Sequence, residues 1–183
     1  MTKVMKLGLV GALTLVLTAA TIAAASGSGF RMKATLTGFE ETPVALSTPA
    51  RGTFQATVDS DSMTYTLSYD GFPTAVLQSH IHFGQRGTTG GVSIFLCSNL
   101  GNGPAGTPAC PSPGGSVTRT VTAADVIGPA GQGIAAGEFA EVLRAIRQGV
   151  AYANVHSTRN AGGEIRGQIR DRDGDDDDHD HDH

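Results

Sequence analysis

The sequence of 183 residues has no tryptophan, and aromatic residues make up only 5% of it. A groove that binds nucleic acid usually combines clustered Lys and Arg with aromatic stacking platforms, so this composition argues against nucleic acid as a partner. The chain also lacks a Gly-x-Ser-x-Gly nucleophile motif and a phosphate-binding Gly-Lys-Thr loop, and no helix pattern follows the Gly-rich segment 84–91. We therefore expect a protein that is not an enzyme.

Charge of either sign is scarce in the central part of the chain. The formal net charge is -4, but eight of the 17 acidic residues lie in the last 13 positions. Residues 26–170 contain ten Lys and Arg against nine Asp and Glu, a net charge of +1. This nearly neutral stretch of about 145 residues is long enough for one hydrophobic core, and we expect one domain.

The first 25 residues have the pattern of a secretory signal peptide. Lys3 and Lys6 precede an uncharged apolar run over 7–22, and Ala23-Ala24-Ala25 supplies a cleavage site of small residues. The alternative is a retained anchor helix, because the run is only a little shorter than the roughly 20 residues that span a membrane. We predict cleavage, a secreted, periplasmic or cell-surface location, and no membrane association afterwards.

Only two cysteines are present, Cys97 and Cys110. They flank a loop rich in Gly, Pro and Asn, and a disulfide that closes a loop of this length stabilises a protein by about 3 kcal/mol in the chain-entropy model. Export favours oxidation, so we predict a disulfide. Two thiolate metal ligands are the alternative, although the spacing is not that of a zinc knuckle.

Short segments of alternating polarity dominate the rest of the chain. Phe54, Ala56 and Val58 alternate with polar residues, and the turn 59–62 separates them from the next such segment. This pattern predicts a mainly β protein, an antiparallel immunoglobulin-like sandwich or barrel of about eight strands. The expected strands cover residues 31–37, 53–58, 63–69, 77–83, 92–97, 116–121, 150–156 and 164–169.

One segment, 135–148, has the helical period instead. Its apolar residues recur at i, i+3, i+4 and i+7, and Gly149 stands where a C-terminal cap belongs. We expect a short amphipathic helix that covers one end of the sheet. A capping-box-like sequence at 122–125 predicts a further helical turn.

The three histidines outside the tail form the main candidate site. His80 and His82 are two residues apart on an expected strand, so both imidazoles point to one face. His156 shares a face with Tyr152 and Asn154 on a later strand. If the two strands are neighbours, three imidazole nitrogens converge, a ligand set that suits copper or zinc.

Two interpretations of these histidines stay open. In the first they bind a metal, with Asn154 or Glu164 as outer hydrogen-bonding partners and Glu40, Glu41 or water as a fourth ligand. In the second the histidines form a structural hydrogen-bond network, and the protein is an interaction module for an unknown extracellular or envelope protein.

The tail 171–183 contains no apolar residue and cannot form a core. It alternates Asp with His179, His181 and His183, a composition typical of weak metal binding. We expect a disordered, solvated acidic tail, and low-affinity metal capture is the alternative.

Several motifs, taken in order, resemble the CHRD domain, a family named from chordin. The first is Leu36-Thr37-Gly38-Phe39-Glu40-Glu41-Thr42-Pro43, followed by Ala50-Arg51-Gly52, by His80-Ile81-His82-Phe83-Gly84, by Tyr152-Ala153-Asn154-Val155-His156-Ser157, and by Gly163-Glu164-Ile165-Arg166-Gly167-Gln168. The resemblance spans roughly 31–170. Ala161, where family members often have Pro, and the loop between the cysteines depart from the pattern.

The resemblance implies an immunoglobulin-like β-sandwich with a distant likeness to copper-zinc superoxide dismutase, and it implies no general activity. The copper site of that enzyme also uses a His-x-His strand pair, but this chain has neither a bridging histidine nor a zinc loop between His82 and His156. We therefore do not expect dismutation. The growth-factor binding of chordin does not transfer to this chain on fold alone.

Overall fold

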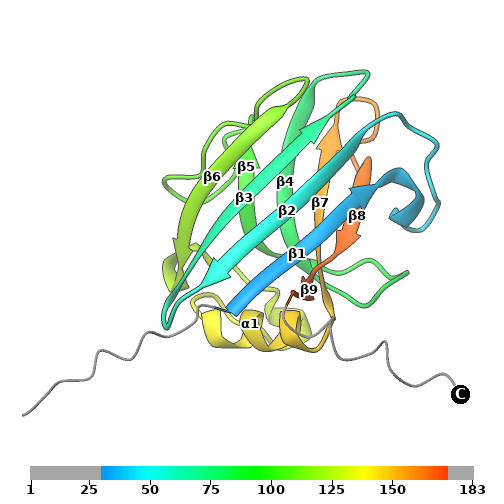
Figure 1. The fold of residues 1–183 in the computed structure, drawn as a ribbon. Helices are drawn as coiled ribbons and strands as arrows, with labels where there is room; N and C mark the ends of the chain where they lie inside the picture. Colours follow the sequence, from blue (N-terminus) through cyan, green and yellow to red (C-terminus); the bar gives the residue numbers. More distant parts are fainter. Residues whose placement is uncertain (1–29, 173–183) are drawn as a thin grey trace, which may run out of the picture.

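The computed structural model describes residues 30–172, which form one antiparallel sheet rolled into a barrel (Figure 1). The signal segment predicted over 1–25 and the tail histidines lie outside the described residues. Residues 30–172 form nine strands: β1 Phe30–Thr37, β2 Arg51–Val58, β3 Ser62–Asp70, β4 Val76–Phe83, β5 Gly91–Ser98, β6 Gly115–Thr122, β7 Ala151–Ser157, β8 Ile165–Gln168 and the two-residue β9 Arg170–Asp171. The helical elements are η1 Gly38–Glu40, η2 Ala123–Asp125, η3 Ala130–Gln132 and α1 Phe139–Arg147.

The strand order is β5-β4-β7-β8-β1-β2-β3-β6, and β9 extends the sheet along β1. The edge strands β5 and β6 approach one another, and a single bridge joins Ile94 of β5 to Val126, just after η2. The barrel is therefore nearly closed. The predicted fold class is confirmed: the protein is mainly β and antiparallel, in the barrel form of the sandwich or barrel expected, with one short helix.

Alternation along the strands decides what fills the barrel. On β2 and β3 every second side chain points inward, and Phe54, Tyr65 and Leu67 are completely buried. Phe54 and Tyr65 stack in the core with ring centroids 6.1 Å apart. The alternation predicted for these two strands is confirmed.

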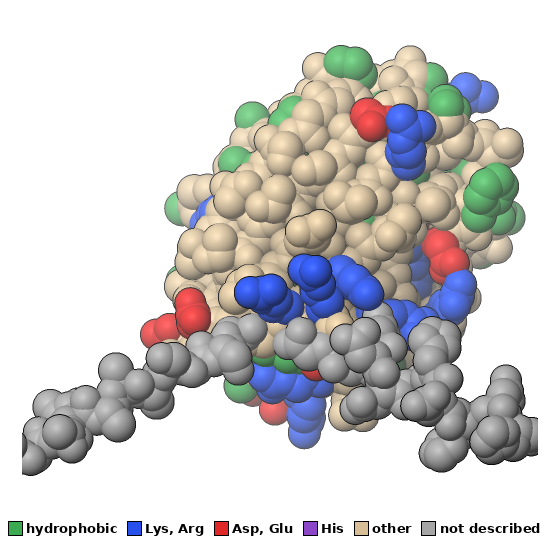
Figure 2. Space-filling view, viewed as in Figure 1, with side chains coloured by type: hydrophobic (Ala, Val, Ile, Leu, Met, Phe, Trp, Pro, Cys, Tyr) green, Lys and Arg blue, Asp and Glu red, His purple; other side chains and the backbone are tan. Residues whose placement is uncertain are grey.

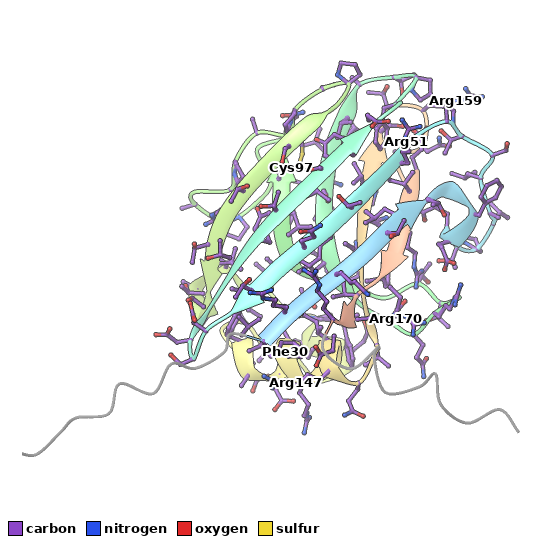
Figure 3. The ribbon with its side chains drawn as sticks, viewed as in Figure 1. Phe30, Arg51, Cys97, Arg147, Arg159 and Arg170 are labelled. Carbon is purple, nitrogen blue, oxygen red and sulfur yellow. A yellow bond between two sulfur atoms is a disulfide. The ribbon has the colours of Figure 1, made fainter. Side chains whose placement is uncertain are left out.

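The helix covers the lower end of the barrel in Figure 1. It begins at Phe139, four residues later than expected, because Gly137 takes a φ of +87° and the backbone N–H of Ala135 donates to the Glu138 carboxylate in a preceding turn. The predicted apolar face of Phe139, Val142, Leu143 and Ile146 is buried. Figure 3 shows Arg147 beside Phe30, where its guanidinium lies 4.8 Å from the ring centroid. The helix thus also contacts the start of β1.

The turn predicted at 122–125 is the short η2 helix. The backbone N–H of Thr122 donates to the carboxylate of Asp125 at 2.9 Å, as in a capping box. Arg119 pairs with the same carboxylate at 2.5 Å.

The disulfide between Cys97 and Cys110 is present and fixes the loop after β5. Such bonds are typical of proteins outside the reducing cytoplasm. Near the C-terminal limit of the described residues, Asp171 pairs with Met32, so the sheet continues one residue past the expected domain end at 170. Among residues 30–172, no helix has the length and apolar character needed to cross a membrane.

Candidate metal centre

Strands β4 and β7 are direct neighbours, which is the condition for their histidines to meet. In the antiparallel register His80 lies opposite Asn154, His82 opposite Tyr152, and Gln78 opposite His156. The intervening residues Ile81 and Val155 belong to the hydrophobic core. The three histidines therefore lie on the outer face of the barrel wall, not inside the barrel.

The three imidazoles converge. The Nδ1 atom of His80 and the Nε2 atom of His156 are 3.1 Å apart, and one nitrogen from each of the three rings lies within 4.8 Å of the others. The ring centroids of His80 and His82 are 5.3 Å apart, and those of His80 and His156 are 4.9 Å apart. Two neighbouring strands thus bring together residues that are about 75 positions apart in the sequence.

Two backbone carbonyls set the tautomers of two rings. Nδ1 of His82 lies 2.9 Å from the carbonyl oxygen of Gly90, and Nδ1 of His156 lies 2.9 Å from that of Ala161. A carbonyl only accepts, so both Nδ1 atoms must carry a hydrogen and donate it. Consequently, Nε2 carries no hydrogen in either ring: that of His82 is buried without a hydrogen-bond partner, and that of His156 accepts a hydrogen bond from Nδ1 of His80.

Burial keeps the rings neutral. The residues are 2%, 8% and 6% exposed for His80, His82 and His156. Desolvation lowers the pKa of His80 to about 2 and that of His82 to about 4, with repulsion from the neighbouring imidazoles adding to the effect. Desolvation also lowers the pKa of His156. At neutral pH each ring therefore carries a single proton and keeps one unprotonated nitrogen.

Aromatic contacts fix the ring planes. The ring of His82 stacks on Tyr152 at a centroid distance of 4.8 Å and an interplanar angle of 3°. The Tyr152 hydroxyl accepts a hydrogen bond from the backbone N–H of Gly90, the residue whose carbonyl orients His82. Phe95 on β5 meets His80 edge to face at 4.4 Å. The imidazoles of His80 and His82 thus each have an aromatic neighbour that limits their rotation.

Arg166 of β8 holds two loops over the site. Its guanidinium lies 3.4 Å from the Tyr152 ring centroid and donates to the hydroxyl of Thr42 and to the carbonyls of Thr88 and Gln85. Thr42 belongs to the β1–β2 connection and the other two residues to the β4–β5 loop. Although Arg166 is only 2% exposed, hydrogen bonds and the aromatic face compensate its charge.

Asn154 and Glu41 both lie beside Gly163, which belongs to the β7–β8 loop. A β-carbon added at Gly163 would lie 2.6 Å from Nδ2 of Asn154 and 2.8 Å from both carboxylate oxygens of Glu41. Burial raises the pKa of Glu41 to about 7, against the opposing effects of Arg166 and a hydrogen bond from Asn154. One Glu41 oxygen is buried without a partner. Only glycine fits at 163, where φ is also +137°.

The other predicted residues lie around the cluster. Asn154 adjoins His82, whose pKa its side chain influences. Glu164 accepts hydrogen bonds from the hydroxyls of Thr48 and Ser157, so it connects the β1–β2 connection to β7. Glu40 pairs with Arg86 near the surface at 2.5 Å. Among the described residues, no carboxylate joins the three histidines as a metal-ligating atom.

The groups that orient the rings leave no signal in the sequence. The carbonyls of Gly90 and Ala161 are backbone atoms of loops, and no side-chain pattern signals them. Arg166 and Tyr152 were visible in the motifs, but their stacking with His82 depends on the register of β4, β7 and β8. The packing of Phe95 on His80 depends on irregular pairing, because the β4–β5 register shifts on both sides of His80-Ile81.

Fold and site together define a disulfide-containing β-barrel with a buried cluster of three neutral histidines on its outer wall. A family model described as the CHRD domain matches residues 32–169. The chain therefore belongs to the CHRD domain family, as its motifs indicated. No curated protein and no solved structure matches the chain.

Proposed function

We propose that this protein binds one copper or zinc ion through His80, His82 and His156 and has no catalytic activity of its own. The observation that carries the proposal is the fixed tautomer of His82 and His156, whose Nδ1 atoms are committed to loop carbonyls. Metal-ligating histidines nearly always donate their second ring N–H in this way, which orients the other nitrogen toward the ion. The neutral state of all three rings adds to the support.

The proposed location is outside the cytoplasm, in the secreted, periplasmic or cell-surface space. The Cys97–Cys110 disulfide supports it, together with the signal-like sequence over 1–25. Storage, delivery or structural use of a metal fits such a location without requiring an enzyme reaction.

The test is metal binding by a full-length chain whose three tail histidines are replaced by Asn, so that the tail does not contribute. We expect one equivalent of copper or zinc per chain and a higher melting temperature, equivalent to about 2.7 kcal/mol at a free metal concentration 100 times Kd. His82→Asn and His156→Asn should abolish stoichiometric binding. Gln78→Asn, on the same face of β4 and opposite His156, is the matched control and should bind normally. Binding that survives both histidine substitutions would refute the proposal.

A second candidate function is an interaction module in which the histidines are structural. The hydrogen-bonding distance between His80 and His156 favours it, because two neutral rings can satisfy one another without an ion. Phe39 and Val44 on the β1–β2 connection are 74% and 64% exposed, and Figure 2 shows hydrophobic side chains on that side of the molecule. Absence of metal binding by the folded protein would favour this function, with an extracellular or envelope protein as partner.

A further inference from the structure

We infer that the histidine cluster selects the cuprous ion, Cu⁺, over Zn²⁺ and Cu²⁺. This inference rests on the proposed function, since it concerns the ion that the same three histidines bind. It follows from the number of ligands, from their charge, and from the way the surrounding side chains fix them.

The number of ligands is the first step. His80, His82 and His156 supply three nitrogens, and no fourth Cys, Asp, Glu or His of residues 30–172 joins their cluster. Zn²⁺ in proteins is almost always four-coordinate, and three-ligand zinc sites complete the shell with water or substrate. Cu²⁺ prefers tetragonal geometry with at least four ligands. Cu⁺, a closed-shell d¹⁰ ion, is stable with two or three ligands.

The closed surroundings act against a fourth ligand from solvent. The three histidines are at most 8% exposed, and the loop residues Gly90 and Ala161 contact two of the rings. Water therefore has little access to the three rings.

The charge of the ligands also favours a monovalent ion. Three neutral imidazoles bring no negative charge, so the ion keeps its full charge in a site shielded from water. The free energy of burying an ion rises with the square of its charge, so a divalent ion suffers about four times the desolvation penalty of a monovalent one. The guanidinium of Arg166, separated from His82 by the Tyr152 ring, repels any cation and repels a divalent one more.

The two nearby carboxyl groups do not offset this charge at the ligands. Glu164 is committed to the hydroxyls of Thr48 and Ser157. Glu41 is 8% exposed and lies beside Asn154 and Gly163. Neither belongs to the cluster of converging ligand atoms.

Rigidity is the third step. His82 is fixed by the Gly90 carbonyl and the Tyr152 ring, His156 by the Ala161 carbonyl, and His80 by Phe95. These contacts resist the rotation needed to open a fourth position. A three-coordinate ion thus fits the site with the least rearrangement.

The experiment compares the affinities of the three ions for the full-length chain with its tail histidines replaced by Asn. Cu⁺ is titrated without oxygen against a chromophoric cuprous chelator, and Zn²⁺ and Cu²⁺ against chelators of known affinity. We expect Cu⁺ to bind at least about 1,000-fold more tightly than Zn²⁺, a difference of roughly 4 kcal/mol. X-ray absorption of the cuprous form should show three nitrogens near 2.0 Å.

Asn154→Asp sharpens the comparison by adding a carboxylate next to His82, in register with His80. It should reduce the preference for Cu⁺ over Zn²⁺ by about tenfold or more, because a negative oxygen ligand favours the divalent ion. Gln168→Glu is the matched control, since it adds the same charge on the outer face of β8 opposite Tyr152. It should change the ratio less.

The outcomes separate the inference from the proposed function. If no ion binds, the proposed function fails and the inference with it. If Zn²⁺ or Cu²⁺ binds as tightly as Cu⁺ and His82→Asn abolishes that binding, the site is real and only the cuprous selectivity is wrong. The affinities measured with the three histidines intact distinguish these results, so the inference is tested even if Asn154→Asp fails to fold.

Discussion

Two outer walls of the same barrel differ in what happens to their polar side chains. The open wall consists of the outward residues of β2, β3 and β6, and the covered wall consists of those of β4, β7 and β8. Figure 2 faces the open wall, whose central part is mostly tan, while Lys and Arg side chains gather along the lower part of this view. The covered wall lies behind it in Figure 1 and carries the histidines.

On the open wall, hydroxyl groups pair across strands and face solvent. Thr64 and Thr120 are 2.8 Å apart, and Thr66 and Thr118 are 2.9 Å apart. On the covered wall, polar residues equally placed by alternation are buried under loops, so they need partners from those loops. Alternation therefore selects the face of the barrel on which a side chain lies, and loop coverage decides whether a polar residue on that face is solvated or buried in a site.

The largest expected effect is the loss of stability in acid, which the buried histidines of the covered wall should cause. The folded pKa values of His80, about 2, and His82, about 4, lie below the unfolded value of 6.5. As pH falls below 6.5 the unfolded chain therefore binds protons that the folded chain does not, and stability decreases. The metal-free protein should lose up to about 1.4 kcal/mol per pH unit for each such histidine between pH 6.5 and 4. Urea unfolding at several pH values measures this slope.

Two variants test whether the buried histidines cause the loss of stability with falling pH. His82→Asn removes one protonation step and should make the decline shallower, so an unchanged slope would contradict the assignment. Glu41 acts in the opposite direction, because its folded pKa of about 7 lies above the unfolded 4.5 and its contribution to stability is lost as pH rises between them. Glu41→Gln should therefore make the acid decline steeper.

Next in size is the loss of a charge that holds the covered wall together. Arg166→Met leaves the Thr88 carbonyl without its donor, removes one of the donors to the Gln85 carbonyl, and removes the stack on Tyr152. We expect a loss of about 3 to 5 kcal/mol in the free energy of unfolding. Chemical denaturation at pH 7 measures it.

The matched control for Arg166 is on the open wall. The Arg51 side chain is 71% exposed and pairs with Asp70 at 3.0 Å. Arg51→Met should change stability by less than about 1 kcal/mol, as is usual for surface ion pairs. Similar losses at both positions would mean that loop coverage does not distinguish the two walls.

A smaller effect is expected at the glycine pair before β8. Gly163→Ala places a methyl group against Asn154 and Glu41 at a φ of +137°, and should cost about 1 to 3 kcal/mol. Gly162→Ala meets no atom within 4 Å and should change stability by less than about 0.5 kcal/mol. Thermal unfolding of the two variants gives the comparison, and equal stability would show that the loop yields easily.

The smallest effect should come from the open wall itself. Thr66→Val removes the hydrogen bond to Thr118 but leaves a β-branched residue on a partly solvated strand. We expect a change within about 0.5 kcal/mol in either direction, measured by urea unfolding. A loss of stability as large as that of Gly163→Ala would mean that hydrogen bonds to water do not compensate for the lost hydroxyl pair.

Some of this structure was predictable because it depends on short-range patterns. Period-two alternation identified the strands and the inward face of Phe54, and helical spacing identified the buried face of Phe139 and Val142. The predicted helix start at 135 is too early. The alanines in 135–138 favour a helix, but the left-handed backbone of Gly137 separates this turn from the helix. Boundaries of this kind depend on single dihedral angles.

The candidate site divides in the same way. By itself the sequence determined that His80 and His82 share a face, that His156 lies on a similar strand, and that two cysteines were available to pair, because side-chain direction follows from the covalent backbone. Only the tertiary structure placed β4 beside β7 and brought the carbonyls of Gly90 and Ala161 to the rings. It also buried the cluster beneath three loops, because strand pairing and loop packing arise from contacts between residues distant in the chain. Those contacts, not the residue types alone, make the three histidines neutral, oriented and able to share one ion.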